Sequence, residues 1–313
     1  MEDENITTMT EFIILGFPEF PELQIPLFLL FLLIYLIILM GNFTIITLTC
    51  LDLRLHTPMY FFLCNLSFID ISSTSLTLPI LMVIFLRKSQ RISSVGCFAQ
   101  MYLFLTFTMA EFSLLTVMAY DRYVAICHPL RYTIIINEKV SVLMALGCWT
   151  VSCLVPVGHT VLISSVFFCG SHEINHFFCD LLPLLILSCT STHVIEDINL
   201  IAGIIIAMPC FMTILTSYVF IISAILRIRS TEGRRKAFNT CSSHLTVVIL
   251  YYGTITCLYM RPASMQSLGQ NKLFALLYNV LIPILNPLIY SLKNKEIKRA
   301  LRKVLAGKSF SRY

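Results

Sequence analysis

The chain has 313 residues, of which 57% are hydrophobic and only 12% are charged, and its mean hydropathy is +0.84. A soluble domain carries about 25% charged residues, so this chain lacks the polar side chains needed to cover a surface that faces water. The composition therefore excludes a soluble globular protein and predicts an integral membrane protein. The net charge of +5 does not indicate nucleic-acid binding, because most of the basic residues lie in the segments on one side of the predicted membrane spans.

Seven apolar segments follow a short acidic N-terminal stretch. Each has the roughly 20 residues that a helix needs to cross the hydrocarbon of a bilayer. The sequence therefore predicts an all-α membrane protein: an extracellular tail over 1–24, a bundle of seven transmembrane helices over 25–292, and a cytoplasmic amphipathic helix and tail over 293–313. The predicted spans are 25–49, 58–84, 98–128, 140–166, 197–226, 238–260 and 272–292.

The distribution of Lys and Arg predicts the orientation of the chain. Seventeen of the 22 Lys and Arg residues fall on one side of these spans and five fall on the other. Because cytoplasmic loops are enriched in basic residues, we expect an extracellular N-terminus, a cytoplasmic C-terminus and a multi-pass protein of the plasma membrane. The first span lacks a basic flank and a cleavage site, so it is expected to be an uncleaved anchor. Asn5 begins an Asn-Ile-Thr sequence and is a predicted glycosylation site.

The third predicted span ends in Asp121-Arg122-Tyr123, and Pro129 follows. Charged side chains at the edge of a membrane helix are costly unless they are paired or hydrated, and they are usually functional. Such a triplet can also mark nothing more than the membrane boundary. Its position at the inner end of the third of seven spans favours the functional interpretation.

Two carboxylates, Asp70 and Glu111, lie inside the second and third predicted spans. Two buried acids repel each other if both are ionised, so we expect them either to share a proton or to bind a sodium-like cation. The sequence leaves both alternatives open. In the first span, Gly41 and Asn42 predict close packing against another helix, with a hydrogen bond from the amide.

Four of the 12 cysteines, Cys97, Cys169, Cys179 and Cys189, fall on the predicted outer side. Four cysteines allow three disulfide pairings, and their spacing alone does not select one. His176 lies close to Cys179 in the long second outer loop, a combination that could bind a metal. An oxidised cysteine supplies no thiolate ligand, so a disulfide is the favoured interpretation.

The inner ends of the last two spans carry polar residues. The run from Lys236 to His244 fits either a hydrated helix start or a surface that opens to bind a partner helix. The seventh span ends in Asn286-Pro287-Leu-Ile-Tyr290, and an internal proline breaks the backbone hydrogen bonds of a helix. We expect Asn286 to satisfy the freed groups and the segment to act as a hinge. Beyond it, apolar residues recur at helical spacing among basic ones over 294–305, which predicts an amphipathic helix on the inner leaflet.

Taken together, these motifs resemble those of rhodopsin-like G-protein-coupled receptors, and more narrowly those of odorant receptors. The wider resemblance rests on Asp70, Cys97, the triplet at Arg122, Trp149 and the motif that ends in Tyr290. The odorant-receptor resemblance rests on longer strings that span nearly the whole chain. They are LHTPMYFFLCNLSFID (55–70), MAYDRYVAICHPLRY (118–132), SY (217–218), KAFNTCSSHLTVV (236–248) and PILNPLIYSLKNKEI (283–297).

The resemblance implies one disulfide between Cys97 and Cys179 and a second between Cys169 and Cys189. It also implies an odorant as ligand, coupling to a stimulatory, olfactory-type heterotrimeric G protein, and a rise in cyclic AMP. We expect no enzyme, because no nucleophile–base pair or zinc-type spacing gathers in one accessible place, and no cofactor beyond a structural sodium ion. The alternatives are a receptor of the same fold for a non-odorous molecule in another tissue, and a small cation-coupled transporter. Transporters often show repeated halves, and this chain shows none.

In this architecture the outer halves of spans three, five, six and seven line a ligand pocket. Seven residues after Cys97, where resembling amine receptors place an Asp, this chain has Phe104. A cationic amine would lack a partner there, so we predict a small, neutral, mostly apolar ligand, bound with modest affinity because few of its atoms are buried. On span three, a stripe of residues repeats at helical spacing and is expected to face the pocket: Phe104, Leu105, Thr108, Met109 and Phe112. Such a stripe can also pack against neighbouring helices. The predicted ligand-binding residues are Phe104, Leu105, Thr108, Met109, Phe112, Asn199, Ala202, Gly203, Ile206, Tyr252, Ile255, Thr256, Tyr259, Leu276 and Asn279.

We expect signalling to be a shift between two states. At rest, Arg122 is expected to pair with Asp121 and with polar groups at the foot of span six, such as His244. When a ligand binds, the pocket is expected to contract around it near Tyr252 and Tyr259. This movement would swing the inner end of span six outward and open a basic cavity for the C-terminal helix of a Gα subunit. Span six lacks the Trp-Pro switch of most relatives, so its pivot is not determined. The residues predicted to form this switch and to couple to the G protein are Asp121, Arg122, Tyr123, Tyr218, His244, Asn286, Pro287 and Tyr290.

Overall fold

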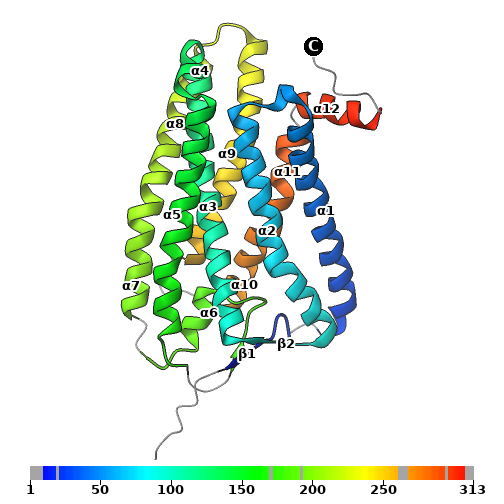
Figure 1. The fold of residues 1–313 in the computed structure, drawn as a ribbon, viewed down its shortest axis with the longest axis vertical. Coiled ribbons are helices and arrows are strands. Elements are labelled where there is room, and N and C mark those ends of the chain that lie inside the picture. The colour runs from blue at the N-terminus through cyan, green and yellow to red at the C-terminus, as the bar shows by residue number, and fades with distance from the viewer. Residues whose placement is uncertain are drawn as a thin grey trace, which may run out of the picture.

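The computed structural model describes residues 10–18, 21–168, 172–190, 193–259, 267–292 and 295–306. Long helices run side by side in one bundle, with a small sheet at one end and a short helix across the other end (Figure 1). This architecture confirms the predicted all-α bundle of seven membrane-crossing helices. Following the predicted charge distribution, we call the sheet end the outer end and the opposite end the inner end.

The crossing helices lie close to the predicted spans. In the described part of the chain, six helical stretches are long and apolar enough to cross a membrane. The remaining one, α9, is apolar only over His244–Tyr259, because its inner part carries the polar run at the foot of span six. The crossing elements are α1 (Gln24–Leu51), α2 (Pro58–Arg87), α3 (Ser94–Cys127), α5 (Glu138–Ser164), α7 (His193–Ala202) continued by η4 (Gly203–Ala207) and α8 (Met208–Leu226), α9 (Thr231–Tyr259), and α10 (Leu268–Leu276) continued by η6 (Leu277–Leu281) and α11 (Ile282–Leu292).

Two of these elements contain a π-helical turn, and each turn is followed closely by a proline. The turns are η4, before Pro209, and η6, before Pro283. Proline has no backbone N–H to donate to the carbonyl four residues earlier, and a helix can widen locally where its hydrogen-bond ladder is interrupted. The sequence therefore explains why the fifth and seventh crossing elements are irregular in their outer and middle parts.

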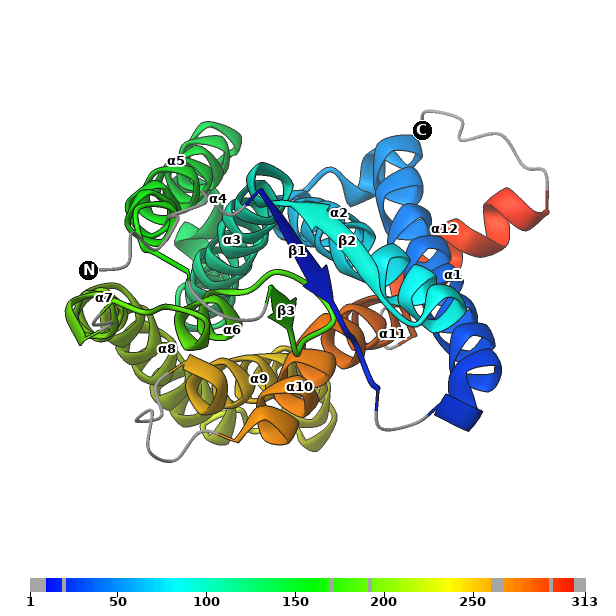
Figure 2. The ribbon, with the colours of Figure 1, turned by 90° about the horizontal axis from the view of Figure 1, so that it is seen from below.

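Helix α3 lies at the centre of the bundle. It contacts α2, α5, α8 and α9, and the end-on view places it inside the ring of the other helices (Figure 2). Its Leu114 and Leu115 have no exposed surface, whereas Met40 on the peripheral helix α1 is 70% exposed. Large exposed apolar surfaces of this kind are expected where a bilayer, rather than water, covers the protein.

Helix α1 packs against α11 through Gly41 and Asn42, as predicted. A Cβ atom on Gly41 would lie 2.9 Å from Pro287, so the two helices can approach this closely only at a glycine. The Asn42 amide donates a hydrogen bond of 3.3 Å to the carbonyl oxygen of Pro283. This is the carbonyl that Pro287 cannot bond, because proline has no N–H. The prediction that Asn286 satisfies this group is wrong: its amide donates to Asp70 instead.

The outer end is closed by a three-stranded sheet that the sequence did not predict. Its central strand β1 (Glu11–Ile14) comes from the N-terminal tail. It pairs antiparallel with β2 (Gln90–Ser93) and parallel with β3 (Glu173–Ile174), so it joins two outer loops (Figure 2). Phe12 and Ile14 are fully buried, so the described segment 11–14 of the tail is part of the folded cap.

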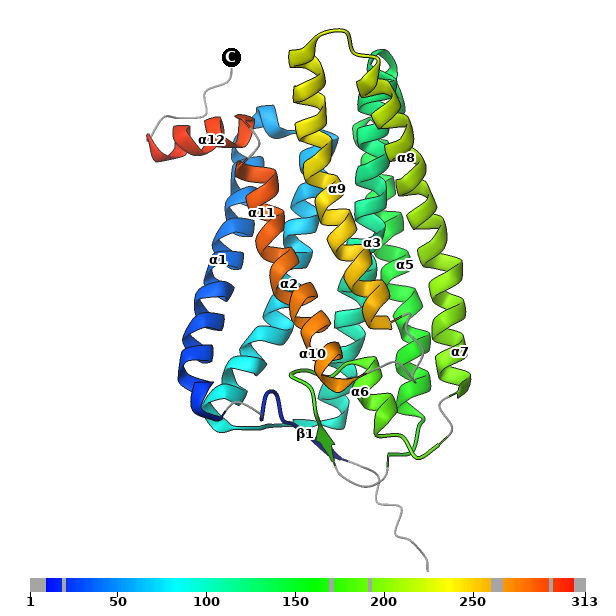
Figure 3. The ribbon, with the colours of Figure 1, turned by 180° about the vertical axis from the view of Figure 1, so that it is seen from behind.

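The inner end carries α12 (Lys295–Leu305), which runs crosswise to the long helices, passes α1 and points away from the bundle (Figure 3). Its Ile297 and Ala300 are buried, and the Tyr60 hydroxyl of α2 donates to Glu296 at 2.9 Å. These contacts confirm the predicted amphipathic C-terminal helix. The remaining short elements are η1 (Pro21–Leu23), η2 (Leu53–Leu55), η3 (Pro129–Arg131), α4 (Tyr132–Ile135) and α6 (Leu181–Ile186).

Candidate ligand site

A cavity of about 110 Å³ lies in the outer half of the bundle, between α3, α5, the α7–α8 element, α9 and the second outer loop. Ten predicted ligand-binding residues line it, from three different crossing elements. They are Leu105, Thr108, Met109, Phe112, Asn199, Ala202, Gly203, Ile206, Ile255 and Tyr259. The π-helical turn η4 supplies part of the wall, so the irregularity that precedes Pro209 shapes the site.

Five predicted ligand-binding residues do not line this cavity. Phe104 is fully buried and packs against Phe178 of the second outer loop, with ring centroids 4.5 Å apart. Tyr252 lies one layer further in, where its ring contacts that of Phe112 at a centroid distance of 4.3 Å. Phe104 therefore packs beneath the second outer loop. Tyr252 contacts Phe112, which lines the cavity.

The other three lie on the seventh crossing element or on the outside of α9. Asn279 donates to the carbonyl of Ala275 and accepts a hydrogen bond of 3.3 Å from the Thr77 hydroxyl of α2. Leu276 packs against the main apolar core, and Thr256 is exposed. Among the described residues, the seventh crossing element therefore supplies no lining residue to this cavity.

The structure adds five lining residues that sequence reasoning missed: Val155, Pro156 and His159 of α5, Leu181 of α6, and Ala207 of η4. The fourth span was not expected to reach the pocket. A usable signal was present, because Pro156 and His159 are three residues apart and so share a face of the helix. The side chain of His159 is polar and lies in the outer half of a mostly apolar span, which could have indicated that this face borders the pocket.

A polar group lies behind the loop side of the cavity. The Tyr259 hydroxyl donates to Asp180 Oδ1 at 2.9 Å, and the Leu181 backbone N–H donates to the same oxygen at 2.8 Å. Asp180 is 1% exposed, and its Oδ2 atom has no hydrogen-bond partner among the described residues. Burial raises the pKa of Asp180 to about 6. Tyr259 and Leu181 therefore stand between the cavity and a buried carboxylate.

The second outer loop is fixed to the bundle by a disulfide between Cys97 and Cys179, which confirms the pairing that the resemblance implied. Gln100 of α3 reinforces it, because its side-chain oxygen accepts from the Cys179 backbone N–H at 3.0 Å. Cys189 is also disulfide-bonded. Its predicted partner Cys169 lies outside the described residues, as does the predicted glycosylation site Asn5.

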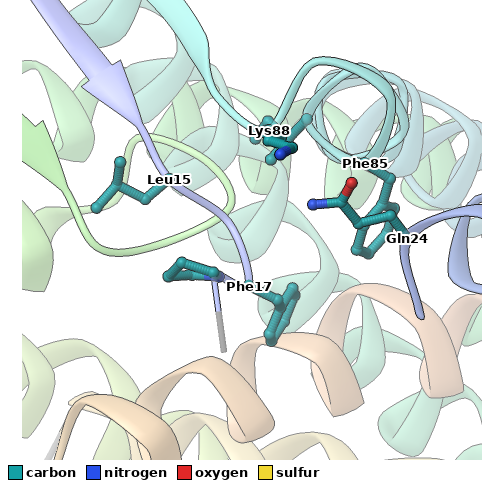
Figure 4. A pocket seen from close by; sticks show the side chains of 7 residues that line it. Leu15, Phe17, Gln24, Phe85 and Lys88 are labelled. Atoms are coloured by element: carbon teal, nitrogen blue, oxygen red, sulfur yellow. The ribbon is translucent and has the colours of Figure 1, made fainter. Parts of the chain in front are cut away.

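A second cavity, of about 130 Å³, lies between the N-terminal segment and the outer ends of α1 and α2 (Figure 4). Phe17 and Phe85 line it and are stacked 6.3 Å apart, with Lys88 and Gln24 beside them. None of its lining residues comes from α3, α8 or α9. Among the described residues, this cavity therefore shares no lining residue with the first cavity.

The two buried acids meet in the middle of the bundle. Asp70 and Glu111 are both at most 1% exposed, and Asn286 donates to both carboxylate oxygens of Asp70, at 3.2 and 2.9 Å. Glu111 Oε1 and Asn286 Oδ1 have no hydrogen-bond partner among the described residues. That part of the chain contains no group of three or more His, Cys, Asp or Glu side chains suited to a metal.

The charged triplet lies at the inner end of α3 in a paired arrangement. Arg122 donates to Asp121 at 2.9 Å, and the other oxygen of Asp121 accepts a 2.7 Å hydrogen bond from the Tyr132 hydroxyl of α4. The neighbouring Tyr123 bonds to His128 at 3.1 Å. Asp121 is 1% exposed, so a buried carboxylate holds both Arg122 and the short helix that follows α3.

The fifth and sixth crossing elements are joined near this triplet by a hydrogen bond between Tyr218 of α8 and His244 of α9. His244 is buried, and its predicted role in holding Arg122 stays a prediction. Asn286 is placed against Asp70 and Pro287 against α1. The side chain of Tyr290 lies outside the described residues.

A chain of hydroxyl groups lies beneath the cavity and connects it to the centre of the bundle. The Thr108 hydroxyl bonds to that of Tyr278 at 2.9 Å, and the Tyr251 hydroxyl donates to the Thr108 carbonyl at 2.6 Å. About two helical turns further in, Thr116 bonds to the Tyr252 hydroxyl at 3.1 Å. These bonds couple α3 to α9 and η6 between the outer cavity and the inner triplet.

The bundle, the outer cavity, the disulfide from α3 to the second outer loop and the paired triplet at the inner end together define a seven-transmembrane receptor. Comparison with known proteins narrows this class, since residues 31–308 match the family model described as olfactory receptor. The chain is 48% identical over 306 residues to olfactory receptor 13D1 of Homo sapiens, covering 98% of this chain and 88% of that receptor.

Two further relatives show the same relationship. Olfactory receptor 5AR1 of Mus musculus is 46% identical, covering 98% of this chain and 99% of that receptor. Olfactory receptor 8D1 of Homo sapiens is 48% identical, covering 98% of this chain and 100% of that receptor. The chain therefore belongs to the olfactory receptor family, as the resemblance of its motifs predicted, and its relatives are receptors rather than enzymes.

Proposed function

We propose that the chain is an odorant receptor whose outer cavity binds a small, neutral, mostly apolar molecule. The observation that carries this proposal is the lining, which contains aliphatic, aromatic and Met side chains but, within the described part of the chain, no Asp, Glu, Lys or Arg. An ion would lose hydration in such a site without gaining a charged partner. The position of Phe104, sealed beneath the outer loop, agrees with the absence of an amine site.

One or two polar groups on the ligand would be recognised at the loop side of the cavity. The Tyr259 hydroxyl, whose hydrogen is donated to Asp180, can accept a hydrogen bond there, and Thr108 and the Asn199 amide offer others. A few precisely placed polar groups in an apolar site fix the orientation of a ligand. We therefore expect alcohols, aldehydes, ketones or esters to be preferred over hydrocarbons of the same size.

The signal would pass from the cavity to the inner end through α9. Phe112 lines the cavity and stacks on Tyr252, whose hydroxyl bonds to Thr116 of α3. A ligand that pulls on this contact would favour an outward position of α9, and the bond between Tyr218 and His244 would then break. Arg122 would turn from Asp121 toward the opened cavity and bind a Gα subunit. We propose that Tyr123, Asn286, Pro287 and Tyr290 take part in this rearrangement.

Downstream, we propose coupling to a stimulatory, olfactory-type G protein and a rise in cyclic AMP. This proposal rests on membership of the olfactory receptor family and on the predicted topology. The distribution of Lys and Arg supports a plasma-membrane protein with its sheet end outside and α12 in the cytoplasm.

For the buried acids we propose a shared proton or a sodium ion. The unsatisfied oxygens of Glu111 and Asn286 suit either occupant. Thermal unfolding in sodium and in choline buffers separates the two: a sodium-dependent midpoint that disappears in Glu111→Gln supports the ion, and no sodium dependence supports the proton.

The ligand proposal is tested by a panel of neutral volatiles, carboxylates and amines of equal carbon number, with cyclic AMP as readout in cells. We expect responses to neutral compounds only. Ile206 lines the cavity, whereas the adjacent Ile205 is 66% exposed on the outside of the bundle. Ile206→Trp should abolish the response at matched surface expression, and Ile205→Trp should preserve it. Responses confined to amines, or equal losses in both variants, would overturn the proposal.

A further inference from the structure

A groove of about 550 Å³ lies in the corner between α1 and α12, at the inner end of the bundle. Its α1 wall includes Leu36, Met40, Phe43 and Thr47, and its α12 wall is formed by Leu301 and Val304. The apolar side chains are unusually open: Met40 is 70% exposed, Phe43 53% and Val304 41%. The walls meet where α12, which follows α11 in the chain, passes the inner end of α1 (Figure 3).

The rim of this groove is strongly basic. Helix α12 contains five Lys or Arg residues and a single acid, Glu296, which accepts a hydrogen bond from Tyr60. Lys298 and Arg302 are both exposed. They are one helical turn apart, and Lys298 is one turn before Leu301, so the pair lies on the polar side of α12 that adjoins the groove. Apolar walls below a pair of cations match the chemistry of a lipid with an anionic head group.

We propose that this groove is a binding site for one anionic phospholipid. Its acyl chains lie along Met40 and Phe43 of α1 and beneath Leu301 of α12, and its phosphate and carboxylate groups pair with Lys298 and Arg302. The cytoplasmic leaflet, to which the charge distribution assigns α12, is the leaflet that contains anionic lipids. The site depends on the fold and on this orientation but not on the proposed odorant function.

The alternative to a specific site is ordinary contact with bulk lipid, and the two differ in head-group selectivity. A bulk contact with the apolar walls does not distinguish phosphatidylserine from phosphatidylcholine with the same chains. A site with two cations at its rim does. Each Lys or Arg near a membrane surface adds a similar attraction to an anionic head group. With two such cations, we expect phosphatidylserine to bind at least about tenfold more tightly than phosphatidylcholine.

The test is native mass spectrometry of the purified full-length receptor, titrated with either lipid in detergent. We expect one tightly bound phosphatidylserine, with an affinity reduced to that of phosphatidylcholine in the double variant Lys298→Gln/Arg302→Gln. The matched control is Arg227→Gln/Arg229→Gln, which removes the same charge from exposed residues after α8 and should leave binding unchanged. Thr47 is exposed in the groove, so Thr47→Trp should block binding of the acyl chains without disturbing the core.

Each other outcome overturns the proposal. Equal retention of both lipids shows bulk lipid only, and equal losses in the α12 and control variants show a non-specific charge effect. A dimer that forms without lipid selectivity and disappears in Thr47→Trp would show that the groove binds a second copy of the chain. Ligand-stimulated cyclic AMP, measured in parallel, reports whether the variants remain folded.

Discussion

The contact between Asn42 and the carbonyl of Pro283 gives a prediction about how the seventh crossing element tolerates its internal proline. Asn42→Leu keeps the size of the side chain but removes the donor, and the Pro283 carbonyl is left unsatisfied in a buried site. An unsatisfied buried acceptor costs about 1–3 kcal/mol. For a chain of this size, 1 kcal/mol corresponds to roughly 2–4 °C in the unfolding midpoint, so the midpoint should fall by about 2–12 °C.

A double-mutant cycle identifies the cause. Pro287→Ala restores a backbone N–H four residues after Pro283, so the carbonyl regains a partner within its own helix. In the Pro287→Ala background, Asn42→Leu should therefore be nearly neutral, with a coupling energy of about 1–3 kcal/mol between the two positions. The measurement is thermal unfolding in detergent, followed by the accessibility of buried cysteines such as Cys148.

Two results would refute this reasoning. Additive effects of Asn42→Leu and Pro287→Ala would show that the amide does not serve the proline-freed carbonyl. A full loss of stability in Gly41→Ala but none in Asn42→Leu would show that close packing alone joins α1 to α11, since a Cβ on Gly41 meets Pro287 at 2.9 Å. Ligand-stimulated cyclic AMP should fall in Pro287→Ala even where stability is recovered, if the proline acts as a hinge.

Tyr132→Phe should raise basal cyclic AMP, because it removes the 2.7 Å hydrogen bond to buried Asp121 that holds Arg122 in its paired position. A hydrogen bond to a charged group is worth about 1.5–3 kcal/mol, which corresponds to a tenfold or greater population shift if only the resting state makes the bond. Tyr35→Phe is the matched control. Equal basal activity in both variants would contradict the role of Tyr132 in holding Asp121 and Arg122 in the resting state. The stability of the folded second outer loop should decrease as the pH falls below about 6.5. The reason is that burial lowers the pKa of His176 to about 3. Between these two pH values, only the unfolded state binds a proton at His176. Stability carried by the neutral ring is present above pH 6.5 and should fall by about 1.4 kcal/mol between pH 7.5 and 5.5. Asp180 acts in the opposite direction, so the test is the difference between the chain and His176→Phe in unfolding at the two pH values, and parallel pH profiles would refute it.

Patterns in the sequence were sufficient to predict the class of the protein and several residues of its candidate site. Apolar length located the crossing helices, because a predominantly apolar segment of about 20 residues has no stable place except a bilayer or a core. Of the predicted stripe on α3, Leu105, Thr108, Met109 and Phe112 line the cavity and Phe104 does not. Helical spacing fixes which side chains point the same way. The inner pairing of Arg122 with Asp121 followed from the cost of an unpaired charge.

The rotation of these helices against one another depends on their packing in the folded bundle and could not be predicted from the sequence. In a membrane both lipid and protein neighbours are apolar, so hydrophobic periodicity does not tell an inward face from an outward one. This is why His159 of α5 was missed as a lining residue and why Phe104 was placed in the cavity rather than beneath the outer loop. The same reason applies to the pairing of β1 with two outer loops and to the bond from Asn42 to Pro283, because both join residues far apart in the chain through contacts that no local pattern encodes.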